Sequence, residues 1–223
     1  MASLFRADHL HAAAPGFAAL TAMWVGMMAM MMLPTAWPWL RAFQRLAAPP
    51  RGTARAVSTL SFAAGYLTAW TFYAIAAAAL QLLLSRSGSL SHDAALGPVS
   101  SATILIVAGA FQFSAWKAAC LRHCRNPLTF LLARWRNGPA SGYGLGLSHG
   151  WYCVGCCWAL MATGFAVGLT NVAWMLALAM IVFAEQVTPR GDQLRPALGI
   201  ALIVGGVSSA LVGVSVGLLI RSP

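Results

Sequence analysis

The chain has 223 residues, of which 60% are hydrophobic and only 8% are charged. A soluble domain carries about a quarter charged residues, so this composition predicts a membrane protein and excludes an ordinary soluble one. The formal net charge of +10 is explained by basic residues that flank membrane spans and contact anionic lipid headgroups, so we expect a lipid bilayer as the partner and no nucleic acid.

Six apolar segments approach the length of about 20 residues that a helix needs to cross a bilayer. They predict an all-α fold, a polytopic transmembrane helix bundle that forms a single integral membrane domain over residues 1–223. The fourth and fifth segments are expected to form a tight antiparallel hairpin, because hardly any residues separate them. The segments are residues 17–38, 56–84, 98–118, 143–168, 171–187 and 196–220.

The basic residues divide unequally between the two sides that six alternating spans would create. Eleven fall on one side and three on the other, which predicts that both termini are periplasmic and that the three basic linkers are cytoplasmic. The chain would then be a multi-pass protein of the bacterial inner (cytoplasmic) membrane. The eleven are Arg41, Arg45, Arg51, Arg55, Lys117, Arg122, Arg125, Arg134, Arg136, Arg190 and Arg195, and the three are Arg6, Arg86 and Arg221.

The first span contains six methionines in ten residues. Met23, Met27, Met30 and Met31 are spaced by four, seven and eight residues, so a helix places them on one stripe. Methionine fills irregular gaps in apolar cores and is also a soft metal ligand. Metal ligation and plain packing are equally compatible with this stripe.

The third span ends in a short motif of thiols and imidazole. Cys120 and Cys124 are one helical turn apart, His123 lies between them, and Pro127 is expected to end the helix. Two such ligands can hold a metal ion but cannot complete a tetrahedral site by themselves. The alternative is a pair of small, half-buried cysteines.

The fourth span places ionisable groups inside an apolar run, where they are costly and commonly functional. His149, Cys153, Cys156 and Cys157 share one face of the predicted helix. Their soft donors suit copper(I), and the cysteine–histidine set would also suit zinc. Cys153 and Cys156 also have the Cys-x-x-Cys spacing of thiol–disulfide exchange sites.

The fifth span contains Glu185, the single acidic residue in the apolar segments. A carboxylate in this place is a candidate metal ligand or proton acceptor. Its closeness to the end of the span makes simple contact with the interface an equally good interpretation.

The motifs occur together over about residues 17–191, and their combination resembles the bacterial family labelled "predicted metal-binding integral membrane protein". The resemblance implies metal binding in a membrane protein with several spans. The family tends to carry a lysine after the glutamate, where this chain has Gln186. The matching stretches are Met23–Pro34, Lys117–Pro127, Trp135–Gly138, His149–Met161, Asn171–Met175 and Glu185.

These observations favour a protein that transports, delivers or senses a soft transition metal, with copper(I) preferred over zinc. A metallochaperone or a subunit of a membrane complex is the expected protein partner. The expected ligands are His149, Cys153, Cys156, Cys157, Cys120, Cys124, Met27, Met30, Met31 and Glu185. Two alternatives remain: a membrane thiol–disulfide oxidoreductase that uses Cys153 and Cys156, and a structural or assembly subunit. The sequence contains no phosphate-binding loop and no catalytic serine motif.

Overall fold

The computed structural model describes residues 16–46, 53–91, 94–134, 139–188 and 190–221, without the side chains of residues 54, 139 and 213–221. The all-α prediction is confirmed for these residues, whose regular elements are all helices. In chain order they are α1 (Phe17–Leu46), α2 (Thr53–Arg86), α3 (Pro98–Gln112), α4 (Ala115–Arg125), α5 (Pro127–Arg134), α6 (Pro139–Ala162), α7 (Gly164–Val167), α8 (Val172–Val187) and α9 (Gly191–Arg221).

Four helical segments in the described residues are long and apolar enough to cross a membrane, rather than the six that were predicted. They are Phe17–Leu46, Arg55–Arg86, Ala140–Val167 and Gly191–Val212. The predicted third span is bent by 65° between α3 and α4, and it counts as a fifth crossing when the two helices are taken together. The predicted fifth span corresponds to α8, which has 16 residues and a length of about 24 Å, less than the roughly 30 Å of a hydrocarbon core.

Local sequence explains the bend and the helix that follows it. The backbone of Ser114 is extended, and its hydroxyl accepts a hydrogen bond from the backbone N–H of Lys117, which caps the start of α4. At the other end, α4 stops at Arg125 and α5 starts at Pro127, so the predicted helix end before this proline is confirmed. The predicted linker 119–142 is therefore largely helical.

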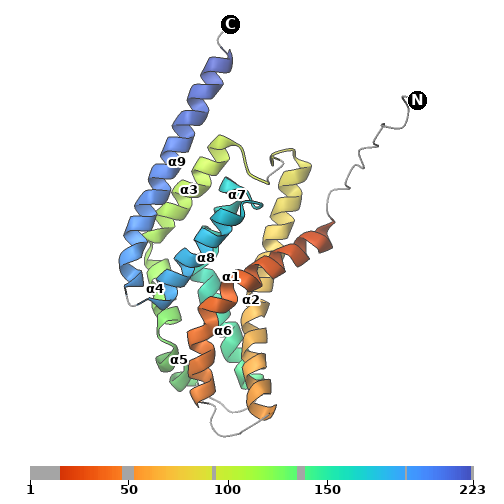
Figure 1. Cartoon of the computed structure of the whole chain (residues 1–223), viewed down its shortest axis with the longest axis vertical. Coiled ribbons are helices and arrows are strands. Elements are labelled where there is room, and N and C mark those ends of the chain that lie inside the picture. The colour runs from red at the N-terminus through yellow and green to blue at the C-terminus, as the bar shows by residue number, and fades with distance from the viewer. Residues whose placement is uncertain (1–15, 47–52, 92–93, 135–138, 189, 222–223) are drawn as a thin grey trace, which may run out of the picture.

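The helices run back and forth between the two ends of the bundle (Figure 1). The end of α1, the start of α2, the α4–α5 junction and the α8–α9 junction lie toward the same end, and these junctions carry the basic residues predicted to share one side. Which side of a membrane this end faces stays a prediction. The chain termini (residues 1–15 and 222–223), together with Arg51 and Arg136, lie outside the described residues.

The closest helix pair is α2 and α6, whose backbones nearly touch. A Cβ atom built on Gly146 would overlap the carbonyl oxygen of Phe62, and one built on Gly65 would overlap that of Tyr143. Small residues permit this approach, as in many membrane helix pairs. The contact fixes the height of α6 relative to α2 and hence the position of the residues that follow Gly146.

Two groups of buried side chains form the core. The larger one gathers the cysteines and buried methionines with aromatic and aliphatic residues of α1, α2, α6 and α8, and the smaller one is built around Trp39, Phe43 and Phe62. Helix α9 packs along α3 and contributes Leu202 to the larger group (Figure 1).

Replacement of Gly146 by alanine should destabilise the protein, because the added methyl group cannot fit without separating α2 from α6. We expect the free energy of unfolding in detergent to fall by about 1–3 kcal/mol. Gly144→Ala is the matched control, since nothing lies within 4 Å of a Cβ atom at that position. Equal stability of the two variants would contradict the close α2–α6 contact.

Candidate metal centre

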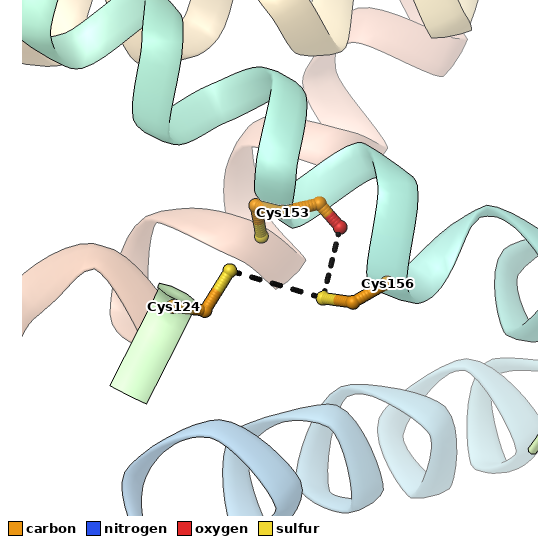
Figure 2. A group of neighbouring side chains, drawn as sticks. All are labelled: Cys124, Cys153 and Cys156. Carbon is orange, nitrogen blue, oxygen red and sulfur yellow. Dashed lines mark hydrogen bonds between the residues drawn. The ribbon is translucent and has the colours of Figure 1, made fainter. Parts of the chain in front are cut away.

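Three thiols from two helices meet in the core. Cys124 comes from α4, Cys153 and Cys156 come from α6, and their sulfur atoms all lie within 4.8 Å of one another (Figure 2). All three side chains are buried. Three converging thiols in an apolar interior form a donor set for a soft metal ion.

The spacing of the sulfur atoms is close to that around a bound ion. Cys124 Sγ lies 3.9 Å from Cys156 Sγ. With metal–sulfur bonds of about 2.3 Å, two sulfur ligands of one ion lie about 3.8–4.0 Å apart in tetrahedral or trigonal geometry. The thiol of Cys156 also donates a hydrogen bond to the carbonyl oxygen of Cys153, at 3.2 Å. The geometry therefore needs little change to accept an ion.

Neutral polar groups from two further helices contact the thiols. The amide nitrogen of Gln186, on α8, lies 3.3 Å from Cys153 Sγ and 3.1 Å from Cys157 Sγ. The hydroxyl of Tyr66, on α2, lies 3.2 Å from Cys153 Sγ. An amide N–H can stabilise a sulfur that carries negative charge, as a metal-bound thiolate does. Sequence reasoning missed both residues, although a glutamine inside an apolar run was a usable signal.

Helix α4 is held against α6 at close range. The thiol of Cys120 would lie 3.0 Å from a Cβ atom built on Gly155, so this glycine leaves the space that Cys120 occupies. The indole N–H of Trp39 donates to the carbonyl oxygen of Cys124 at 2.6 Å, which ties the end of α4 to α1. Cys120 thus contacts the back of α6 and stands apart from the three-thiol group.

The imidazole of His149 lies in an aromatic stack rather than among the thiols. Its ring is fully buried, stacks on Trp39 with 3.8 Å between ring centroids, and lies 5.3 Å from the ring of Tyr66. Neither ring nitrogen has a hydrogen-bond partner in the described residues. His149 and Cys153 are four residues apart on α6, but the His149 ring nitrogens are not among the donor atoms that lie within 4.8 Å of one another.

Residues 21–209 match the family described as "PpoB2: Copper chaperone". The chain belongs to this copper-chaperone family. The searches among curated proteins and among solved structures gave no match. The matched residues include the helices that carry every thiol.

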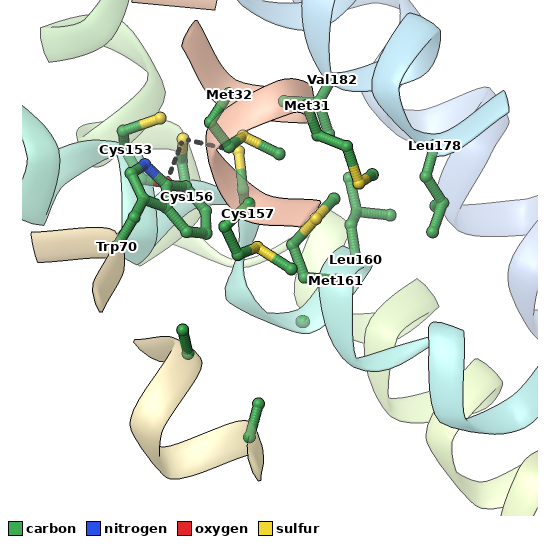
Figure 3. Packing of buried hydrophobic residues seen from close by; sticks show 14 of the residues in the cluster. Met31, Met32, Trp70, Cys153, Cys156, Cys157, Leu160, Met161, Leu178 and Val182 are labelled. Carbon is green, nitrogen blue, oxygen red and sulfur yellow. Dashed lines mark hydrogen bonds between the residues drawn. The ribbon is translucent and has the colours of Figure 1, made fainter. Parts of the chain in front are cut away.

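The predicted methionine stripe is only partly buried in this copper-chaperone chain. Met30 is 76% exposed and Met23 is also exposed, whereas Met28, Met31 and Met32 are buried in the thiol-containing core. Figure 3 shows Met31 and Met32 of α1, Met161 of α6 and Cys157 within this one buried cluster. The error arises because α1 carries methionine on several faces, and packing against α2 and α8 decides which face is buried.

Cys157 and the half-buried Met27 stay close to this core. Cys157 Sγ lies 3.3 Å from Cys156 Sγ, but Cys157 does not belong to the three-thiol group. Met27 packs against the outside of the buried cluster. Both residues therefore contribute sulfur to the surroundings of the thiols, without a ligand position that the geometry defines.

Glu185 forms an ion pair instead of facing the thiols. Its carboxylate oxygen Oε2 lies 2.7 Å from Lys117 Nζ, and both side chains are buried. The carboxylate is not among the donor atoms of the three-thiol group. The residue after the glutamate is Gln186, and Lys117 of α4 supplies the positive charge. The pair joins α8 to α4, one residue away from the amide that contacts the thiols.

Replacement of Lys117 by methionine should leave Glu185 as a buried carboxylate without its cation. We expect the free energy of unfolding to fall by about 3 kcal/mol. The double variant Lys117→Met/Glu185→Leu should recover most of this loss, because it removes both charges. Chemical unfolding in detergent measures both values, and equal losses in the single and double variants would contradict the role of the pair.

Proposed function

We propose that this chain is an integral membrane copper chaperone that holds copper(I) as its cargo between the sulfur atoms of Cys124, Cys153 and Cys156. The observation that carries the proposal is the convergence of these three buried thiols from α4 and α6. The match to the copper-chaperone family over residues 21–209 supports it independently. The apolar helices described above support a position in the membrane.

The donor set favours copper(I) over zinc. The group contains three sulfur atoms and neither nitrogen nor carboxylate oxygen. Soft thiolate and thioether ligands select copper(I), whereas structural zinc sites almost always have four ligands. The buried methionines around Cys157 add further soft sulfur to the surroundings. His149, Cys157 and the methionines would act as accessory donors while the ion enters or leaves.

Delivery is the form of metal handling that this arrangement supports best. A chaperone must hold an ion that would otherwise react with water or other thiols, and later release it to a partner. Burial of the three sulfur atoms protects the ion, and the uncharged contacts from Gln186 and Tyr66 stabilise the site without adding a competing charge. The partner would be a copper-requiring protein, reached directly or within a membrane complex.

The oxidoreductase alternative uses the same thiols but meets a steric obstacle. Disulfide exchange requires a thiolate to contact the sulfur of its substrate. Cys153 and Cys156 are completely buried, so a substrate disulfide reaches them only if α4 or α8 moves away. Trapping with an alkylating reagent separates the two functions, since an oxidoreductase forms a disulfide between these cysteines in each cycle.

Removal of any one of the three thiols should abolish stoichiometric copper binding. We expect about one copper(I) ion per chain in protein purified under anaerobic conditions, and less than about a tenth of this in Cys124→Ser, Cys153→Ser and Cys156→Ser, because each change removes one of the three soft ligands and leaves a hard hydroxyl in its place. Elemental analysis measures the ratio, and X-ray absorption at the copper edge should show three sulfur neighbours.

Cys120→Ser is the matched control, because this thiol lies on α4 one turn from Cys124 but outside the three-thiol group. It should bind as much copper as the wild type. Copper-free protein with a reversible disulfide, or full copper binding by the Cys153→Ser/Cys156→Ser variant, would overturn the proposal.

A further inference from the structure

A pocket opens between α4 and α5. It has a volume of about 480 Å³ and is lined by Ala119, Arg122, His123, Asn126, Thr129, Phe130, Ala133 and Arg134. A volume of this size falls within the range of small-molecule sites, which is about 300–1,000 Å³. The two helices that line it meet at the end of the bundle that carries the basic helix junctions (Figure 1).

The charge of the pocket selects an anionic occupant. Two arginines, Arg122 and Arg134, contribute to the wall, and none of the lining residues is acidic. The guanidinium of Arg134 is held over the ring of Phe130 and donates to Ser148 Oγ at 3.2 Å, so its position is defined by neighbouring groups. Arginine binds carboxylates in a two-pronged geometry that few other side chains offer.

His123 connects this pocket with the thiols. It precedes Cys124 on α4, and its ring stacks on Tyr152, with 3.8 Å between the ring centroids. Tyr152 in turn precedes Cys153 on α6. The Nε2 atom of His123 is buried and has no hydrogen-bond partner in the described residues. A neutral imidazole nitrogen in this state is available as a metal ligand.

The three thiols offer almost no surface through which an ion could be handed over, since Cys124 is 4% exposed and the other two are fully buried. The ring centroids of His123 and Phe130 lie 4.7 Å apart, and those of Trp39 and Phe130 lie 5.4 Å apart. Trp39 also donates a hydrogen bond to the carbonyl oxygen of Cys124. His123 and Phe130, which line the pocket, therefore pack against residues that flank the thiols.

We infer that the α4–α5 pocket is the port through which copper(I) reaches the buried thiols, that its donor is a copper(I) complex of a small anionic thiol, and that His123 is the first protein ligand. This inference rests on the proposed copper-chaperone function. The carboxylates of the donor bind Arg122 and Arg134, and its sulfur brings the ion to His123. A soft ion calls for a sulfur-containing carrier, and the two arginines call for a carboxylate-bearing one.

The transfer is a ligand exchange without electron transfer. A copper–sulfur bond to the donor breaks as the bond to His123 Nε2 forms, and bonds to the sulfur atoms of Cys124, Cys153 and Cys156 then replace it. Each cysteine thiol that binds loses its proton: a departing donor thiolate takes up one proton and leaves as a thiol, and the remaining protons pass to water. The ion stays copper(I) throughout.

The test measures how fast the detergent-purified, metal-free chain takes copper(I) from its glutathione complex, with stopped-flow absorption as the readout. Arg122→Gln/Arg134→Gln should load about tenfold more slowly at low donor concentration, because two charge contacts with the donor are lost. His123→Phe, which retains a ring against Tyr152, should slow loading by a similar factor. Final copper content after long incubation should equal that of the wild type in both variants.

Two controls distinguish an effect on copper entry through the pocket from an effect on the three-thiol site. Arg41→Gln/Arg45→Gln removes the same charge from exposed arginines at the same end of the bundle but outside the pocket, and it should load at the wild-type rate. Copper(I) supplied by 2-mercaptoethanol, which has no carboxylate, should load the wild type and the Arg122/Arg134 variant at equal rates. Unchanged loading from glutathione in the pocket variants, or equal slowing in the Arg41/Arg45 variant, would overturn the port. A wild type that holds no copper at the end of the incubation would instead refute the proposed function.

Discussion

Contact between α4 and α6 is the constraint on which the thiol group depends. Cys153 and Cys156 are one helical turn apart on a single helix, but a third sulfur can reach them only from a second helix that approaches closely. That helix is α4, which is separated from α3 by the bend at Ser114. A straight continuation of α3 would carry Cys124 in another direction, so the capped break is part of what creates the site.

Helix α8 makes two separate polar contacts in the core, an ion pair with α4 and an amide contact with the thiols. Lys117 and Cys124 are seven residues apart on α4, and Glu185 and Gln186 are adjacent on α8. The ion pair therefore fixes α8 against α4 at one level, and the amide of Gln186 contacts the thiols at the next. The ion pair joins α4 to α8, whereas the side chains that contact the thiols, Gln186 and Tyr66, are uncharged. A copper ion bound by the thiols is therefore not repelled by a neighbouring positive charge.

Local periodicity was sufficient to predict the parts of the site that lie on one helix. The spacing of Cys153 and Cys156 placed them on a common face, and the shared side of the bundle brought Cys124 toward them. Relations between distant segments were not accessible in this way. Lys117 and Glu185 are 68 residues apart, and no pattern in either segment predicts that the two side chains form a pair.

The methionines show the same limit within a single helix. Every face of α1 near Met30 carries a thioether or another apolar side chain, so hydrophobicity does not distinguish the inner face from the outer one. The neighbouring helices make that choice, and they bury Met28, Met31 and Met32. The described residues contain fewer long apolar helices than the six predicted spans, because composition does not reveal that the fifth apolar run forms a helix of only 16 residues.

Gly155 stands between two ligands in the sequence Cys153-Val-Gly-Cys156 and binds nothing itself. Its missing side chain is the recess into which the Cys120 thiol of α4 fits. A methyl group there would lie 3.0 Å from the Cys120 sulfur, closer than ordinary van der Waals contact, so the Cys120 thiol or α4 itself would have to shift. The motif thus encodes a distance between helices as well as a set of donors.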